Sequence, residues 1–438
     1  RRYRIDVTQA PLLRLVHAWD APSQRIVAML MFHHMALDHS ALEVVSQEMQ
    51  AFLLGRGERL GDAVPFRTYV AHALLGVSEQ EHEAFYREML GDIDDPTLPF
   101  GLQDVQGDGH AIEEARREVD AELGRRLRTR ARHLGVSAAS LFHLAWAQVL
   151  AVVSGKQRVV FGTVLMGRML GADATDRALG IFINTLPFRV DVGGESLHAA
   201  VKTTHARLTT LLRHEHAPLA LAQRCSAVVA PTPLFSALLN YRHSASSAAN
   251  ASAEALAAWR GIAALSSEER TNYPLTLSVD DLGEHFALTA LTAPGIDAAR
   301  ICGYLHQALE NLVWALEQPA DPASTRLAII PPSERRQLLL GFNDTHRDYP
   351  DQLTVHGVFE ALALAQPEAI AVVHGEQILS YRQLNIRANR LAHHLISLGL
   401  KPGDHVAILL ARSAGLLVSQ LAISKCAAAH APLDIHAP

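Results

Sequence analysis

The stretch that decides the fold runs Arg25-Ile-Val-Ala-Met-Leu-Met-Phe-His-His-Met-Ala-Leu-Asp-His39. Residues 25–32 are apolar and partly β-branched, which predicts a strand. A similar run at 12–19 precedes it, and Asp20-Ala-Pro-Ser-Gln24 between the two has the composition of a turn. The sequence therefore predicts a strand pair whose second strand ends at two adjacent histidines, His33 and His34.

Working outward from this pair, a helix is expected at 41–54, capped by Ser40, because Leu42, Val45 and Met49 recur at helical spacing. Further strands are predicted at 112–119, 159–165 and 181–190, helices at 78–90, 121–133, 137–153 and 298–317, and a loop at 244–258. Alternating strands and helices predict an α/β or α+β protein with a substantial sheet.

The densest chemical cluster is His33-His34-Met-Ala-Leu-Asp38-His39. A histidine at a strand end can carry a ring nitrogen into a cleft and exchange a proton there near neutral pH. The same residues could instead be structural or exposed histidines, or three imidazoles and a carboxylate around a metal ion. Spacing alone leaves all three interpretations open.

Composition narrows the class of protein. The chain has 438 residues, 49% apolar and 19% charged, with a net charge of −6, which excludes a disordered chain and predicts several domains. No long Lys/Arg run is present, so neither nucleic acid nor a membrane is an expected partner. Cys225, Cys302 and Cys426 are widely spaced, which indicates a reduced, cytoplasmic setting without a cysteine zinc cluster. The first residue, Arg1, and the abrupt end at Pro438 suggest a piece of a longer chain.

The histidine cluster resembles the His-His-x-x-x-Asp-Gly motif of condensation domains of non-ribosomal peptide synthetases. Other segments are similar to further motifs of that family and stand in its order. Residues 3–14 precede the cluster, and 65–70, 162–168, 179–189 and 233–240 come after it. The resemblance implies a chloramphenicol-acetyltransferase-like fold of two lobes with the histidine loop at their junction. It also implies transfer of an acyl or peptidyl thioester to the amine of an aminoacyl thioester, both held on phosphopantetheine arms of donor and acceptor carrier proteins. No directly bound cofactor and no metal are implied.

The resemblance assigns roles to single residues. His34 would orient the attacking amine, take its proton or stabilise the tetrahedral intermediate, and His33 would hold the loop beside it. Asp38 would pair with Arg168 as structural support of the active site. Asn240 would line the channel, although a satisfied amide at a strand end is an equally good interpretation.

One position departs from the motif, because His39 stands where the family has glycine. This replacement implies a backbone that tolerates a side chain, and a histidine there would line the channel. The sequence Asp38-His39-Ser-Ala-Leu-Glu43, together with 104–109, resembles the dual epimerisation/condensation subtype, which inverts the donor residue before joining it. Stand-alone epimerisation and a non-catalytic docking domain for carrier proteins remain alternatives, with a metal-dependent hydrolase more remote.

A second resemblance, at 355–360, 379–385, 388–392 and 401–404, is to the start of an amino-acid adenylation domain. The predicted condensation domain comprises the end of its N-terminal lobe at 1–100 and its C-terminal lobe at 101–328. A linker at 329–352 follows. Residues 353–438 are predicted to be a truncated adenylation domain, which is an α/β subdomain of adenylate-forming enzymes. This last part is expected to be too short to make an adenylate and to act as the neighbour of the condensation domain.

Overall fold

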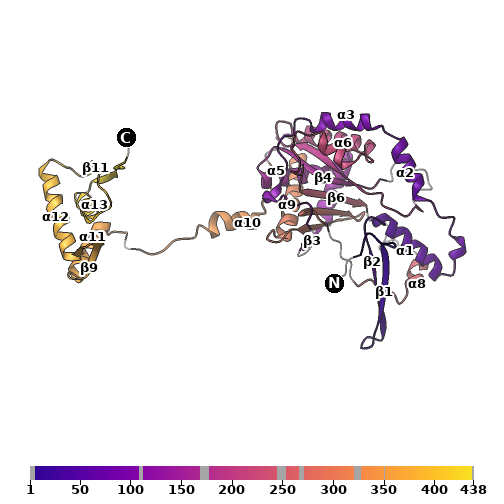
Figure 1. Cartoon of the computed structure of the whole chain (residues 1–438), viewed down its shortest axis with the longest axis horizontal. Coiled ribbons are helices and arrows are strands. Elements are labelled where there is room, and N and C mark those ends of the chain that lie inside the picture. The colour runs from indigo at the N-terminus through magenta and orange to yellow at the C-terminus, as the bar shows by residue number, and fades with distance from the viewer. Residues whose placement is uncertain are drawn as a thin grey trace. The chain divides into compact units, whose positions relative to one another are not determined.

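The computed structural model describes residues 5–107, 112–167, 177–243, 253–265, 271–319, 327–349 and 351–436. The chain divides into two compact units, Arg1–Gly341 and Phe342–Pro438 (Figure 1). The first unit carries the histidine loop. The predicted domain boundaries within it stay predictions.

A six-stranded mixed sheet forms the centre of the first unit. Its strands are β3 (Glu113–Val119), β4 (Arg158–Leu165), β5 (Asn184–Asp191), β6 (Ala237–His243), β7 (Leu275–Asp281) and β8 (Phe286–Thr292). They lie in the order β3-β8-β7-β6-β4-β5, with β6 parallel to both β4 and β7 and the other pairs antiparallel. The fold is therefore mixed α/β, as the sequence predicts.

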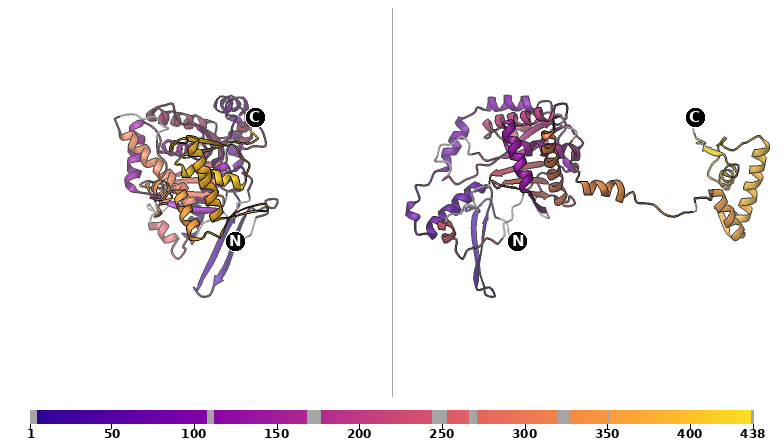
Figure 2. Two further views of the ribbon diagram at one scale, coloured as in Figure 1. Left: turned by 90° about the vertical axis from the view of Figure 1, so that its left-hand side faces the viewer. Right: turned by 180° about the vertical axis from the view of Figure 1, so that it is seen from behind.

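Long helices cover this sheet and complete the core (Figure 2). They are α4 (Ala121–Leu134), α5 (Ala138–Ser154), α6 (Leu197–Arg213) and α9 (Ala298–Glu317). Residues 140–150 of α5 are buried on every side, with Trp146 fully enclosed, so this helix forms the middle of the core. A helix that is apolar all round is the kind that a core buries completely.

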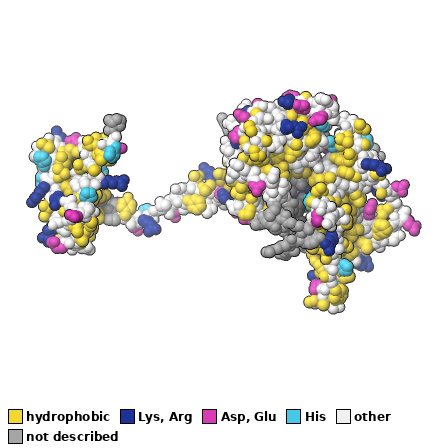
Figure 3. All heavy atoms as spheres, viewed as in Figure 1, with side chains coloured by type: hydrophobic (Ala, Val, Ile, Leu, Met, Phe, Trp, Pro, Cys, Tyr) yellow, Lys and Arg dark blue, Asp and Glu magenta, His cyan; other side chains and the backbone are white. Residues whose placement is uncertain are grey.

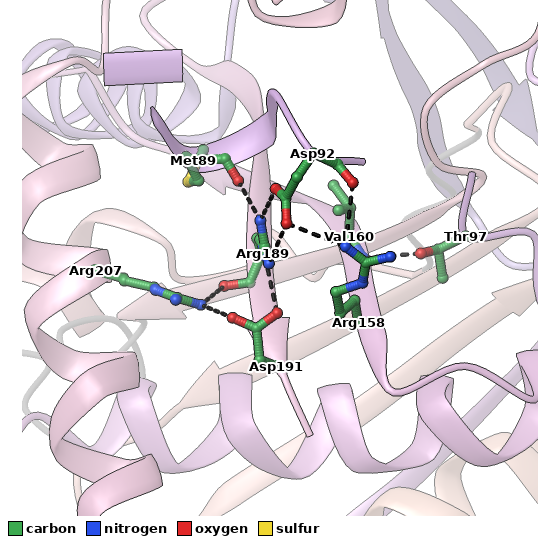
Figure 4. Close-up of polar contacts among 8 residues, drawn as sticks. All are labelled: Met89, Asp92, Thr97, Arg158, Val160, Arg189, Asp191 and Arg207. Carbon is green, nitrogen blue, oxygen red and sulfur yellow. Dashed lines mark hydrogen bonds and ion pairs between the residues drawn. The ribbon is translucent and has the colours of Figure 1, made fainter. Parts of the chain in front are cut away.

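The outer strand β5 is tied to the segment after α3 (Glu79–Leu90) by a network of charged groups (Figure 4). Arg189 donates to the carbonyl oxygen of Met89 at 3.0 Å, to the Asp92 carboxylate and to Asp191 at 2.8 Å. Arg189 is 12% exposed, whereas Asp92 is 56% exposed. Hydrogen bonds from Arg189 lower the pKa of the Asp92 carboxyl. The network joins α3 to the sheet edge beside α7 (Leu219–Arg224).

The remainder of the first unit is built on a hairpin, β1 (Leu13–Asp20) and β2 (Arg25–Phe32), whose strands pair antiparallel in register from Leu13↔Phe32 to Asp20↔Arg25. The hairpin projects from the sheet layer, and hydrophobic side chains gather on it (Figure 3). Leu15, Trp19 and Ile26 are all more than half exposed. The helices here are α1 (His39–Leu53), α2 (Phe66–Leu75) and α8 (Ala253–Ala258), with short turns at Gly57–Arg59 and Pro99–Gly101.

The short helix α10 (Pro332–Arg336) and a π-helical turn, Gln337–Gly341, end the first unit. Glu334 of α10 accepts hydrogen bonds from Tyr304, at 2.8 Å, and from Arg300, both on α9. These contacts anchor the end of the unit to its core.

The second unit contains α11 (Val355–Ala365), β9 (Ile370–His374), β10 (Gln377–Ser380), α12 (Tyr381–Ser397), β11 (His405–Ile408), α13 (Ala414–Lys425) and β12 (Ala429–Pro432). β9 and β10 form an antiparallel pair, and β11 and β12 a parallel pair. Small clusters around Leu379 and Ala422 hold the helices to these strands.

Most predicted elements of the sequence are present within a residue or two of their predicted ends. Three predictions are wrong. Asp38, not Ser40, caps α1; the strand predicted at 181–190 begins only at Asn184; and residues 253–258 of the predicted loop form α8. Helix α6 and strands β6, β7 and β8 were not predicted as elements.

In the described parts of the chain, no single helix is long and apolar enough to cross a membrane. The bent pair α4 and α5 reaches the required length and composition together, with an angle of 108° between its halves.

Candidate active site

The histidine loop begins where β2 leaves its partner strand. His33 N–H donates to the carbonyl oxygen of Leu12 at 3.0 Å, and the carbonyl oxygen of His33 accepts from Ala36 at 2.9 Å. The His33 ring folds back onto its own loop, because its Nδ1 accepts from the Met35 N–H at 3.1 Å. His33 therefore shapes the turn that follows the strand.

His34 is the next residue and lies half-buried at the end of the strand. Its ring packs edge-on against Phe32, with ring centroids 5.7 Å apart and planes at 81°. A half-buried imidazole that packs against an aromatic ring can keep a defined orientation and still reach a substrate.

Asp38 closes the loop and begins α1. It is 1% exposed, and its Oδ1 accepts the Ala41 N–H at 2.7 Å, which caps the helix. Its Oδ2 accepts the Phe182 N–H at 2.9 Å, and its own N–H donates to the carbonyl oxygen of Gly180 at 3.3 Å. One buried carboxylate thus holds the histidine loop, the start of α1 and the segment before β5 together.

His39 is the first residue of α1 and points into an exposed position, with Nε2 3.8 Å from Glu43 Oε1. Its backbone is helical and is not among the positive-φ residues of the described chain. Glycine is favoured where φ is positive, because other residues adopt that conformation at a steric cost. A side chain at this position therefore carries no backbone strain.

The other two predicted site residues are Arg168 and Asn240. Arg168 lies outside the described residues. Asn240 is half-buried on β6, beside Ser278 of β7, and its buried Oδ1 has no hydrogen-bond partner among the described residues. No hydrogen bond or ring contact in the described chain joins Asn240 to the histidine loop.

An aromatic cluster, to which the sequence motifs gave no role, is connected to the loop through Phe182, whose N–H bonds Asp38. It consists of Phe66 and Tyr69 on α2, Phe182, and His216, which follows α6. The Tyr69 hydroxyl lies 3.3 Å from the carbonyl oxygen of Phe182 and 3.2 Å from His216 Nδ1. Burial lowers the pKa of His216, and the nearby charge of His82 lowers it further. The string His214-Glu-His216 was the signal in the sequence that could have found this cluster.

Among the described residues, no three His, Cys, Asp or Glu side chains converge in a geometry that could hold a metal ion. At the histidine loop, the half-buried imidazole of His34 lies on a turn that the hydrogen bonds of His33 and Asp38 hold in place. This arrangement suits proton exchange and the positioning of a polar substrate.

Comparison with known proteins identifies the class. Residues 1–339 match the family model of the condensation domain, and residues 359–438 match that of the AMP-binding enzyme. The chain therefore belongs to the condensation-domain family and continues into the start of an AMP-binding domain.

The relatives are peptide synthetases. The chain is 47% identical to malpibaldin synthetase and 48% identical to malpinin synthetase, both of Mortierella alpina, over 100% and 99% of its length. It is 29% identical to surfactin synthase subunit 2 of Bacillus subtilis over 92% of its length. It spans only 8%, 6% and 11% of these three proteins.

Solved structures agree on the fold. A four-domain nonribosomal peptide synthetase bound to AMP and glycine aligns with 99% of this chain, and the chain covers 34% of that structure, at a TM-score of 0.77 and 18% identity. The condensation domain of the monacolin K polyketide synthase aligns with 73% of the chain, which covers 75% of that structure, at a TM-score of 0.55 and 20% identity. The condensation fold predicted from the sequence motifs is confirmed.

Proposed function

We propose that this chain forms an amide bond between an upstream acyl or peptidyl thioester and the amine of a downstream aminoacyl thioester. Family membership supports transfer chemistry of this kind. One observation supports the assignment of this chemistry to His34. His34 lies in a loop that is held at one end by β2 and at the other by the buried carboxylate of Asp38.

The chemistry requires one proton to move. As the amine nitrogen attacks the thioester carbonyl, the new C–N bond leaves positive charge on nitrogen, and the C–S bond must break. A neutral imidazole at His34 can accept the amine proton, and the departing sulfur ends as a thiol after gaining a proton. An amine is a good nucleophile without activation, so His34 acts by orienting it as much as by removing its proton.

His33, Asp38 and Arg168 take supporting roles in this proposal. The carboxylate of Asp38 is occupied by two backbone N–H groups, which supports a structural role over a chemical one. His39 and Asn240 are proposed to line the channel, and the unpartnered Oδ1 of Asn240 is a group that a polar substrate could satisfy.

The proposed partners are donor and acceptor carrier domains, which present their substrates on phosphopantetheine, and the adenylation domain whose start follows in this chain. No cofactor is proposed to bind the condensation domain itself. Residues 359–438 alone are proposed to form no adenylate. An assay of ATP–pyrophosphate exchange with this chain tests this proposal, and exchange activity would contradict it. A cytoplasmic location stays a prediction.

The experiment loads donor and acceptor carrier domains and follows peptide transfer by mass spectrometry with the full-length protein. We expect His34→Ala to reduce transfer by about 10²–10⁴-fold, the range that positioned acid–base groups supply. His133→Ala, a change of an exposed histidine on α4, is the matched control and should transfer normally. Equal transfer by His34→Ala and the wild type would refute the assignment, and stoichiometric zinc or iron in the purified protein would favour a metal-dependent enzyme.

A second activity, epimerisation of the donor residue before transfer, is proposed because Asp38-His39-Ser-Ala-Leu-Glu43, together with residues 104–109, resembles the dual epimerisation/condensation subtype. The test supplies an L-configured donor and determines the configuration of that residue in the product. Retention of the L configuration would reduce the activity to simple condensation.

A further inference from the structure

A continuous series of hydrogen bonds connects the histidine loop to His216. The series runs from Ala41 and Asp38 to the Phe182 N–H, and from the Phe182 carbonyl oxygen to the Tyr69 hydroxyl and His216 Nδ1, with the distances given above. The two polar groups of Phe182 thus contact both ends, because its N–H faces Asp38 and its carbonyl faces Tyr69.

Packing fixes the parts of this series in place. The Tyr69 ring lies 4.4 Å from the Phe182 ring and 5.3 Å from Phe66, measured between centroids. Gly167 has φ of +66°, and a Cβ there would overlap the Phe182 carbonyl oxygen. The backbone on both sides of His216 is held by Asn184, whose Nδ2 donates to the carbonyl oxygens of Glu215 and Ala217, each at 2.8 Å. The series is therefore a rigid connection between packed elements.

The Tyr69 hydroxyl has one hydrogen and faces two acceptors when His216 Nδ1 is unprotonated. The hydrogen is then shared between the Phe182 carbonyl and the imidazole. When His216 is protonated, its Nδ1–H donates to the tyrosine oxygen, and the hydroxyl hydrogen turns wholly to the Phe182 carbonyl. Glu215 Oε1 lies 3.8 Å from His216 Nε2 and favours the neutral tautomer that carries its hydrogen on Nε2. Protonation of His216 then adds a hydrogen at Nδ1 and strengthens the bond between Tyr69 and Phe182.

We propose that Tyr69 and His216 are positioning residues for His34, which hold the catalytic loop through Phe182 and Asp38. The inference rests on the proposed function, since it assigns to this pair the orientation of the imidazole that acts in transfer. Both act through the loop, because the Phe182 backbone connects Tyr69 to Asp38.

Several titratable groups face His216. Within the described chain they are Tyr69 on α2, Glu215 with Oε1 3.8 Å from His216 Nε2, His82 on α3, and His72 and Arg213 across a cavity of about 240 Å³ that these residues share with His216. His82 and His214 share a hydrogen between their Nδ1 atoms at 2.9 Å, and burial lowers the pKa of both. Since the pKa of His216 is also lowered, His216 takes up its proton at a lower pH than an ordinary histidine does.

The test compares kcat for peptide transfer by the full-length protein and its Tyr69→Phe variant across pH, with Tm measured in parallel. Phenylalanine keeps the ring packing and removes only the hydroxyl. Tyr241→Phe is the matched control, because it removes a buried hydroxyl that donates to Asp281 at 2.7 Å, away from the loop. Taking the ratio of wild-type to variant kcat cancels any pH dependence that the two proteins share.

We expect a ratio of about two to ten for Tyr69→Phe, the effect of one hydrogen bond, with KM little changed. The ratio should rise as pH falls through the His216 pKa. When both proteins also carry His216→Asn, residue 216 cannot titrate, and the rise should disappear. A ratio that stays flat with pH, whatever its size, overturns the inference, as does the same pH-dependent rise in Tyr241→Phe. If His34→Ala transfers normally, the proposed function fails; if it is inactive while the Tyr69→Phe ratio is flat, only the positioning role fails.

Discussion

Asp38 offers the sharpest test of how the histidine loop is held. Its carboxylate caps α1 through Ala41 and also accepts the Phe182 N–H, a contact between residues 144 positions apart. We predict that Asp38→Ala destabilises the first unit far more than loss of a helix cap, because the variant leaves the Phe182 N–H buried without its partner.

The magnitude follows from the two contacts. Loss of an N-cap side chain costs about 1 kcal/mol, with a range of roughly 0.5–2 kcal/mol. A hydrogen bond to a charged group contributes about 1.5–3 kcal/mol, and at Asp38 it is buried. We therefore expect Asp38→Ala to lower the free energy of unfolding by about 2.5–4 kcal/mol.

Asp297→Ala is the matched control. Asp297 caps α9 and also accepts two backbone N–H groups, from Ala299 at 2.8 Å and Arg300 at 3.2 Å, but it is exposed and both partners belong to its own helix. We expect a loss of about 1 kcal/mol there. The difference between the two variants measures what Asp38 contributes beyond a helix cap, which includes the long-range contact to Phe182.

The assay is urea unfolding followed by tryptophan fluorescence. All four tryptophans, Trp19, Trp146, Trp259 and Trp314, lie in the first unit, so the signal reports this unit without interference from the second. Equal losses in Asp38→Ala and Asp297→Ala would refute the reasoning. A stable Asp38→Ala protein that cannot transfer peptide would instead give the carboxylate a chemical role.

Three further predictions concern the core. Burial lowers the pKa of His143 to about 4, so the unfolded state binds the extra proton and stability should fall as pH drops from about 6.5 towards 4; His143→Gln should flatten this part of the pH–stability curve measured by urea unfolding. Gly162→Ala should lower Tm through a loss of about 1–3 kcal/mol, because its Cβ would overlap Leu238, whereas Gly194→Ala meets no neighbour and tests only its positive φ. Asp281→Asn should lower stability in chemical denaturation by at most about 3–5 kcal/mol, the range for a fully buried pair, since it breaks the ion pair between the buried Asp281 and the partly exposed Arg128, 2.6 Å away.

The strand–loop–helix around the histidines could be predicted because its signals are local. Alternating and helical spacing of apolar residues places β2 and α1, and both lie within two residues of their predicted bounds. The cap of α1 could not be chosen in this way, since Asp38 and Ser40 are both good N-cap residues. The partner at Phe182 decides it, because only Asp38 bonds that N–H and the helix together.

The sheet illustrates the same limit. Strand β4 is visible as an apolar run, but β6, β7 and β8 were not predicted, and no local pattern states that β6 lies parallel between β4 and β7. Strand order depends on which surfaces bury each other across long stretches of chain. That information belongs to packing and is absent from periodicity.

The sequence alone determined that this chain carries the histidine motif of a condensation domain and the start of an adenylation domain, because motif order and local periodicity are properties of the chain. Only the tertiary structure decided what braces the motif. Asp38, Phe182, Tyr69 and His216 come from four separate segments. Their side-chain and backbone hydrogen bonds exist only once the core has brought the bonded atoms of each successive pair within 3.5 Å.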